Sequence, residues 1–196
     1  ELGSGFKIAM RDLEIRGAGN LLGTQQSGHI SAIGFELYCK LLKQSVERLN
    51  GNTDATRAEC SLYLDFINTN EADHFQSKEK SLPAFIPSSY LEETKIRIAA
   101  YRQLSELVTI KEMKGLIREW HDRFGKLPDE VRNLMLCTEL KIRASSKGIH
   151  SVEIEGSKLM MKRNDEFILI EGKFPRINTN KNEERLKKAV DLLKKF

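Results

Sequence analysis

Three helix patterns in succession, between residues 89 and 148, constrain the fold of this chain more than any other feature of its sequence. Two of them open with a capping box, Ser89-x-x-Glu92 and Thr109-x-x-Glu112. In a capping box the hydroxyl accepts a hydrogen bond from a backbone NH that helix geometry leaves unpaired, and the glutamate accepts one from the capping residue's own NH. The sequence therefore predicts a helix directly after each box.

The third helix of this series has a different start signal. Pro128 is suited to the first position of a helix, because its missing NH costs no hydrogen bond there. Asp129 and Glu130 follow, and their negative charges favour the positive end of the helix dipole. Gly125 and Gly148 stand where the second and third helices should end, as glycine commonly does.

Strand patterns lie on both sides of the three helices. Apolar and polar residues alternate over 60–66, which predicts a strand. Further on, a glycine–serine pair and an asparagine–aspartate pair separate three short apolar segments, as turns separate the strands of a meander. The predicted meander strands and the basic helix that follows them are 152–155, 159–163, 167–170 and 183–196. We predict that residues 58–196 form one α+β domain with three consecutive helices, an antiparallel strand meander and a C-terminal helix.

The N-terminal part of the chain has a different organisation. Apolar side chains recur at helical spacing over 5–16 and again over 32–49, and glycines punctuate the connecting segment 17–28. These features predict a helical hairpin followed by a polar linker. We assign residues 1–57 to this hairpin and linker, so the predicted fold class of the whole chain is α+β with two parts.

The net charge, the cysteines and the apolar segments of the chain indicate in which compartment the protein works. The 196 residues carry a formal net charge of +4, which is compatible with nucleic acid nearby and equally with an ordinary mixed-charge surface. The three cysteines are scattered, as is typical of a reducing compartment. No apolar run is long enough to span a membrane, and no secretory leader opens the chain. We expect a cytoplasmic fragment of a larger protein that has no membrane partner.

Sequence patterns typical of catalytic and metal sites are missing. There is no GxxxxGK[ST] phosphate loop, no HExxH motif and no cysteine–histidine cluster. The GxG at Gly17 and Gly19 follows a charged, helix-like segment and not a buried strand, so it favours a tight loop over a dinucleotide site. Ser27 and His29 are too close in sequence to present a nucleophile and its base easily. We predict no catalysis, cofactor or metal in this chain.

Residues 3–23, with Gln26-Ser27-Gly28, resemble the TRG (translocation) motif that the RecG helicases share with the bacterial transcription-repair coupling factors, the Mfd family. Downstream, Phe85-Ile86-Pro87 and the segments 97–104 and 122–128 look like the C-terminal domain of the coupling factors, which RecG lacks. The resemblance therefore points to the C-terminal fragment of a coupling factor.

In that family the hairpin transmits ATP-driven motion of the motor domains to double-stranded DNA and so pushes a stalled RNA polymerase forward. The resemblance implies that Arg16 and Gln26 couple the motor to DNA, with Arg11 next. For Arg11, an intrahelical salt bridge or a solvated side chain is an open alternative. ATP and Mg²⁺ would belong to motor domains that this chain does not contain.

The resemblance gives the C-terminal domain a regulatory role, because in the family it folds back on a module that resembles UvrB and hides the surface that recruits UvrA. Glu119 and Asp122 are the candidates for this autoinhibitory interface, since a helical wheel places both off the buried stripe. A local Arg118–Asp122 pair is the alternative. The C-terminal lysines favour a solvated helix face over a DNA contact. A pure protein–protein interaction module with no motor role remains the alternative for the whole chain.

Overall fold

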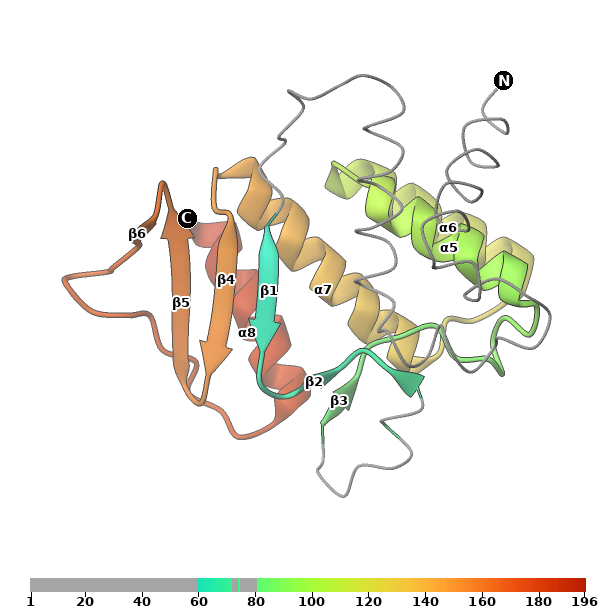
Figure 1. Cartoon of the computed structure of the whole chain (residues 1–196), viewed down its shortest axis with the longest axis horizontal. Coiled ribbons are helices and arrows are strands. Elements are labelled where there is room, and N and C mark those ends of the chain that lie inside the picture. The colour runs from blue at the N-terminus through green and yellow to red at the C-terminus, as the bar shows by residue number, and fades with distance from the viewer. Residues whose placement is uncertain (1–59, 72–73, 75–80) are drawn as a thin grey trace, which may run out of the picture. The chain divides into compact units, whose positions relative to one another are not determined.

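The computed structural model describes residues 60–71, 74 and 81–196 (Figure 1). All of them belong to one compact unit, residues 57–196. The predicted helical hairpin lies outside the described residues, so the hairpin and the boundary after residue 57 stay predictions.

A four-stranded sheet with helices on one face forms one half of this unit (Figure 1). Its strands in spatial order are β1 (Ser61–Leu64), β4 (Ser151–Glu155), β5 (Lys158–Arg163) and β6 (Glu166–Phe167). β4, β5 and β6 are antiparallel neighbours, which confirms the predicted meander. β1 pairs with β4 in parallel, so the sheet is mixed. Local sequence patterns do not reveal this long-range pairing.

The two predicted turns of the meander are confirmed, and their backbone explains their composition. Gly156 has φ +56°, and Asn164 and Asp165 have φ +50° and +63°. Each turn is a two-residue connection between antiparallel strands. Such short hairpins favour left-handed backbone because its twist matches that of the flanking strands, and Gly, Asn and Asp tolerate it best.

The four helices that the sequence predicts within 58–196 are all present. They are α5 (Thr94–Glu106), α6 (Ile110–Phe124), α7 (Asp129–Ser146) and α8 (Asn182–Lys195). A second, two-stranded parallel sheet consists of β2 (Ile67–Asn68) and β3 (Leu82–Pro83). This small sheet leads from the end of β1 into the segment before α5.

One of the two predicted capping boxes is confirmed and the other is wrong. The Thr109 side chain accepts from the Glu112 NH, and the Glu112 carboxylate accepts from the Thr109 NH, so α6 starts as predicted. The helix predicted after Ser89 instead starts at Thr94, and its N-cap makes no side-chain capping bond. The Pro87 carbonyl accepts from the backbone NH groups of Tyr90 and Leu91, so a turn forms where the box should act.

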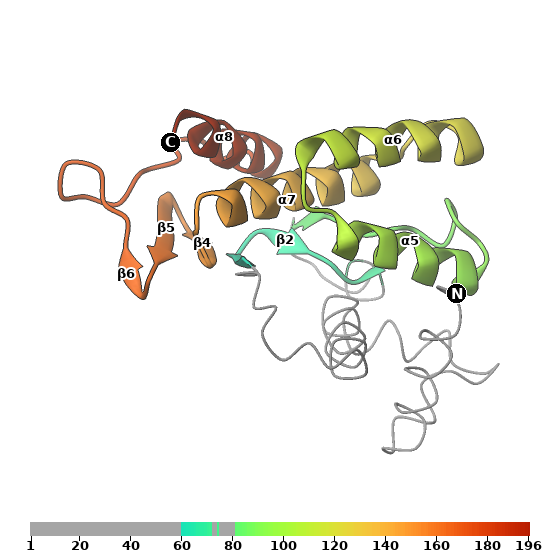
Figure 2. The ribbon, with the colours of Figure 1, turned by 90° about the horizontal axis from the view of Figure 1, so that it is seen from above.

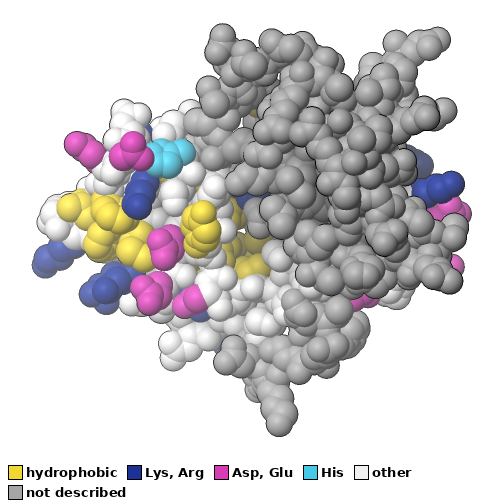
Figure 3. Space-filling model, in the orientation of Figure 1, with side chains coloured by type: hydrophobic (Ala, Val, Ile, Leu, Met, Phe, Trp, Pro, Cys, Tyr) yellow, Lys and Arg dark blue, Asp and Glu magenta, His cyan; other side chains and the backbone are white. Residues whose placement is uncertain are grey.

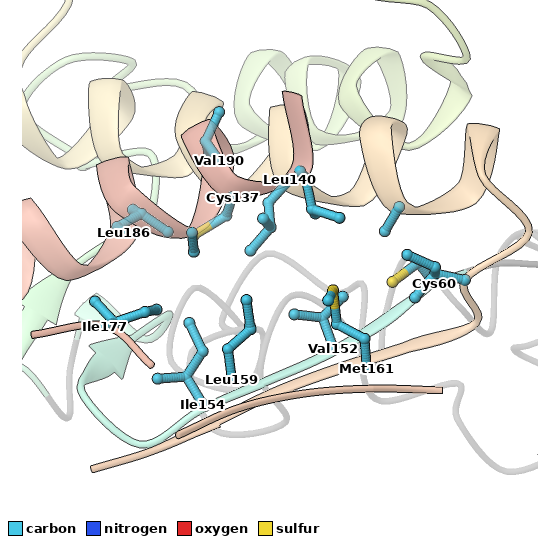
Figure 4. Close-up of a cluster of buried hydrophobic side chains, with 14 of the residues drawn as sticks. Cys60, Cys137, Leu140, Val152, Ile154, Leu159, Met161, Ile177, Leu186 and Val190 are labelled. Carbon is cyan, nitrogen blue, oxygen red and sulfur yellow. The ribbon is translucent and has the colours of Figure 1, made fainter. Parts of the chain in front are cut away.

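Two hydrophobic cores hold the unit together, and α7 contributes to both. The first packs the sheet against α7 and α8, with apolar side chains pointing between the layers (Figure 4). The second lies among α5, α6 and α7 and surrounds Trp120, whose relative exposure is 0%. Figure 2 shows α7 extending from the sheet to the α5–α6 pair. The position of α6 is therefore set by one face of a helix that also supports the sheet.

Candidate interaction surface on helix α6

Helix α6 buries one stripe and leaves the other side to solvent, and this division places the predicted interface residues. Met113, Leu116 and Trp120 are its buried residues. The indole NH of Trp120 also donates to Oε1 of Gln103 on α5, at 3.2 Å. Burial and this hydrogen bond together fix the rotation of α6 about its axis, and so decide which side chains face outward.

Glu119 and Asp122 are both exposed, as the helical wheel predicts. The side chain of Asp122 is 81% exposed and that of Glu119 is 44% exposed. Three residues along a helix correspond to a rise of about 4.5 Å, so the two carboxylates stand one turn apart. A single basic patch on a partner can therefore reach both. Their role in an interface stays a prediction.

The ion pair on this turn of α6 is not the Arg118–Asp122 pair that the sequence offered as an alternative. Nη1 of Arg123 donates to Oε1 of Glu119 at 2.9 Å. Asp122 lies beside His121, with its Oδ1 3.8 Å from the imidazole Nδ1. An acid placed four residues before a base is the favoured order on a helix, which explains why Glu119–Arg123 forms in preference to Arg118–Asp122.

The C-terminal end of α6 is held by aromatic contacts. The guanidinium carbon of Arg123 lies 4.9 Å from the ring centroid of Phe124. Phe124 in turn meets Tyr90 edge to face, with 6.2 Å between ring centroids. The Tyr90 hydroxyl donates to the carbonyl of Gly125, the glycine that ends the helix at φ +83°. These contacts tie the end of α6 to the turn before α5. The surface around Glu119 is therefore held both by the buried Trp120 and by the aromatic contacts at the end of the helix.

The motor-coupling candidates Arg11, Arg16 and Gln26 lie outside the described residues. Their proposed role rests on the sequence motif alone.

Two lysines of α8 engage acidic neighbours on their own helix. Lys187 donates to Glu183, and Lys194 donates to Asp191. The hydrogen bond and charge of Lys187 lower the pKa of Glu183, and those of Lys194 lower the pKa of Asp191. This pairing fits the interpretation that the exposed side of α8, which carries these lysines, is a solvated surface of mixed charge.

The buried thiols suit a structural role. Cys60 and Cys137 are both buried. Burial raises the pKa of Cys60 to about 11, so its thiolate is scarce near neutral pH and it is a poor nucleophile. Within residues 60–71, 74 and 81–196, no group of three His, Cys, Asp or Glu side chains could hold a metal ion. None of the helices in this part of the chain has the length and apolar character needed to cross a membrane.

A second exposed surface covers the strand end of the unit. Phe167, Leu169 and Ile170 are large apolar residues that are at least 43% exposed. Figure 3 shows hydrophobic side chains gathered over β5 and β6, with charged side chains around them. Phe167 contacts Phe174 edge to face at 5.3 Å, and the Lys162 ammonium lies 4.8 Å from its ring centroid.

Sequence reasoning missed the residues that support the α6 surface. Glu119 and Asp122 were predicted as site residues, but no supporting role was predicted for Arg123, Phe124 or Tyr90. A usable signal was present for Arg123, because Glu119-x-x-x-Arg123 is the favoured acid-before-base order. No local signal pointed to Tyr90, because it reaches Phe124 only through the tertiary fold.

The comparisons with known proteins concern the same part of the chain. Residues 81–168, which include α5, α6 and α7, match the family model described as the TRCF domain. The C-terminal domain of a transcription-repair coupling factor, a solved structure, aligns with a TM-score of 0.48 and 15% identity. That alignment covers 72% of this chain and 98% of that one.

Several bacterial proteins named transcription-repair-coupling factor are similar in sequence. The Bacillus subtilis protein is 40% identical over 154 residues, a span of 78% of this chain and 12% of that protein. A Staphylococcus epidermidis protein is 36% identical over 82% of this chain and 13% of its own length. The Borreliella burgdorferi protein is 34% identical over 76% of this chain. This chain thus spans about an eighth of the length of these relatives, and it belongs to the transcription-repair-coupling factor (Mfd) family.

Proposed function

We propose that the described domain is the regulatory C-terminal part of a transcription-repair coupling factor, and that it docks through Glu119 and Asp122 of α6 onto a basic patch elsewhere in the parent protein. The receiving surface is the module that resembles UvrB, and docking hides the surface that recruits UvrA. One observation carries this proposal: two exposed carboxylates stand one turn apart on α6, within the segment that matches the family model.

The support of α6 favours tight, oriented docking. A capping box fixes the start of the helix, Trp120 fixes its rotation and the Tyr90 contacts fix its end. A surface that is already ordered before binding loses little conformational entropy on binding. Charge pairs at such an interface contribute orientation and selectivity as much as affinity. The domain can therefore act as a reversible cover for a basic surface.

Reversal of both charges tests the docking proposal. In the full-length protein, Glu119→Lys combined with Asp122→Lys would place like charges against the basic patch and release the UvrB-like module. We expect UvrA to bind this variant at least about tenfold more tightly than the unaltered protein, because like charges at an interface cost several kcal/mol. A UvrA titration by fluorescence anisotropy or a quantitative pull-down measures the change.

The matched control reverses two carboxylates on α8, Glu183→Lys with Asp191→Lys, which changes net charge equally. This control should leave UvrA binding as it is. If the α6 reversal also left UvrA binding unchanged, the proposed interface would be wrong.

We propose further that the N-terminal segment couples the motor of the parent protein to DNA. Its match to the TRG motif supports this role for Arg16, Gln26 and Arg11. ATP and Mg²⁺ are bound by the motor domains of the parent protein. The motor moves along double-stranded DNA and pushes a stalled RNA polymerase forward. The protein then works in the cytoplasm. Conformational steps of this kind depend on a few residues at the hinge between moving parts.

Arg16→Ala in the full-length protein separates the motor role from a pure interaction role. We expect DNA translocation to fall by about tenfold or more, because residues at a hinge affect the rate of turnover and even a misplacement of about 1 Å can cost a hundredfold in rate, while UvrA binding stays within twofold. A triplex-displacement assay measures translocation on duplex DNA. Unimpaired translocation would favour the alternative, in which the chain is an interaction module with no motor role.

A further inference from the structure

The surface around Glu119 and Asp122 is charge-balanced and not acidic. Arg118 and Arg123 lie on the same two turns of α6, and all four side chains are exposed. Two carboxylates and two guanidinium groups sum to zero formal charge. A basic partner therefore meets little net attraction at long range, and its recognition depends on short-range pairs. The cation nearest to a docking carboxylate then affects how strongly that carboxylate can pair with the partner.

Arg123 is held where it competes for Glu119. Its Nη1 donates to Oε1 of Glu119 at 2.9 Å, and its guanidinium carbon lies 4.9 Å from the Phe124 ring centroid. The ring is itself fixed by the edge-to-face contact with Tyr90. A cation over an aromatic face and beside a carboxylate gains from both contacts. The guanidinium thus keeps one oxygen of Glu119 occupied and repels any cation that approaches the other.

Asp122 has a different environment. Its carboxylate is 81% exposed, and its Oδ1 lies 3.8 Å from the imidazole Nδ1 of His121. A carboxylate beside an imidazole at this distance keeps most of its capacity to accept hydrogen bonds from a partner. Of the two docking carboxylates, Asp122 is therefore the more available and Glu119 the more restrained.

We propose that Arg123 is an internal competitor that weakens docking through Glu119 and so keeps the autoinhibited state reversible. This inference rests on the proposed function of Glu119 and Asp122. In the undocked protein the Arg123 guanidinium pairs with Glu119. On docking, a basic side chain of the partner takes that place or shares the carboxylate, and the energy of the original pair is lost. Docking is then weaker than two free carboxylates would make it.

Removal of the competitor should strengthen docking. In the full-length protein, Arg123→Gln keeps the length and polarity of the side chain but removes its charge. We expect UvrA to bind this variant about two- to fivefold more weakly, because an exposed ion pair of this kind has that strength. Arg123→Lys, which keeps the charge, should restore most of the unaltered value. Lys187→Gln on α8 is the matched control, since it breaks an acid-before-base pair of the same spacing, and it should change nothing.

A double-mutant cycle separates direct competition from a general effect of charge. Glu119→Gln should weaken docking more in the Arg123→Gln background than in the unaltered protein, whereas Asp122→Asn should weaken it equally in both. Equal coupling of Arg123 to both carboxylates would show a long-range effect and overturn the competitor role. Stronger UvrA binding by Arg123→Gln would show that Arg123 itself contacts the partner, which also overturns it.

The failure of this inference is distinguishable from failure of the proposed function. If the double reversal of Glu119 and Asp122 releases UvrA binding but Arg123→Gln has no effect, the interface stands and the competitor does not. If neither change affects UvrA binding, the interface itself is wrong. Circular dichroism of each variant should match the unaltered protein, because all the exchanged side chains are exposed.

Discussion

Replacement of Trp120 by alanine is expected to lower the free energy of unfolding by about 3–5 kcal/mol, the range for removal of a buried aromatic side chain. The Trp120 side chain is fully buried in the core shared by α5, α6 and α7. Its loss leaves a cavity and also removes the partner of the Gln103 amide. Urea denaturation of the 196-residue chain, followed by far-UV circular dichroism, measures the change.

Arg118 provides the control for this prediction. It lies on the same helix and is exposed, so Arg118→Ala should change the unfolding free energy by less than about 0.5 kcal/mol. A loss below about 1 kcal/mol for Trp120→Ala would mean that α6 does not depend on this core. The docking surface would then need another explanation for its fixed orientation.

Replacement of Arg185 by alanine is expected to destabilise the sheet half of the domain by about 2–3 kcal/mol, because a guanidinium with several partners is removed together with its packing. Arg185 is a buried residue of α8. Its Nη2 donates to Oδ1 of Asp65 at 2.9 Å and to the carbonyl of Gly156, and its guanidinium carbon lies 4.0 Å from the Phe66 ring centroid. One side chain thus joins α8, the end of β1 and the β4–β5 turn.

Two further variants resolve what Arg185 contributes. Arg185→Lys keeps the charge but not the planar fork, so we expect it to recover less than half of the lost stability. Lys188→Ala, an exposed position on the same helix, should be close to neutral. Thermal unfolding of the same chain ranks the three variants. Equal melting temperatures for Arg185→Ala and the unaltered chain would contradict the proposed bridging role.

The Asp65 side chain is 41% exposed, so solvent screening keeps the stability lost on Arg185→Ala below that expected for a fully buried ion pair.

Local signals in the sequence predicted most elements of this domain, because their causes are local. The capping box at Thr109, the glycine at 125 and the left-handed turns at 156 and 164–165 each act through neighbouring residues. The alternation over 60–66 predicted a strand for the same reason. These elements were correct to within a few residues.

The errors and omissions in the sequence analysis have nonlocal causes. The box at Ser89 failed because the Pro87 carbonyl and the carboxylate of Glu71 bind backbone NH groups of this segment in a turn. The parallel pairing of β1 with β4 and the Arg185 bridge join residues that are distant in sequence. Capping and periodicity patterns carry no information about such pairs.

The same contrast holds for the candidate site. The helical wheel predicted the exposure of Glu119 and Asp122, because exposure depends mainly on which stripe of α6 is buried. The aromatic support from Tyr90 was not predictable in this way, because Tyr90 lies in a turn ahead of α5 and reaches Phe124 across the fold.

The parallel pairing of β1 with β4 has a consequence for synthesis of the protein on the ribosome. Ser61 pairs with Ser151, so β1 is made long before its partner strand exists. Contacts between distant segments form late and slow the folding of a domain. The nascent chain therefore carries β1 without its partner strand until β4 has emerged, and chaperones that bind unpaired strands can act during that interval.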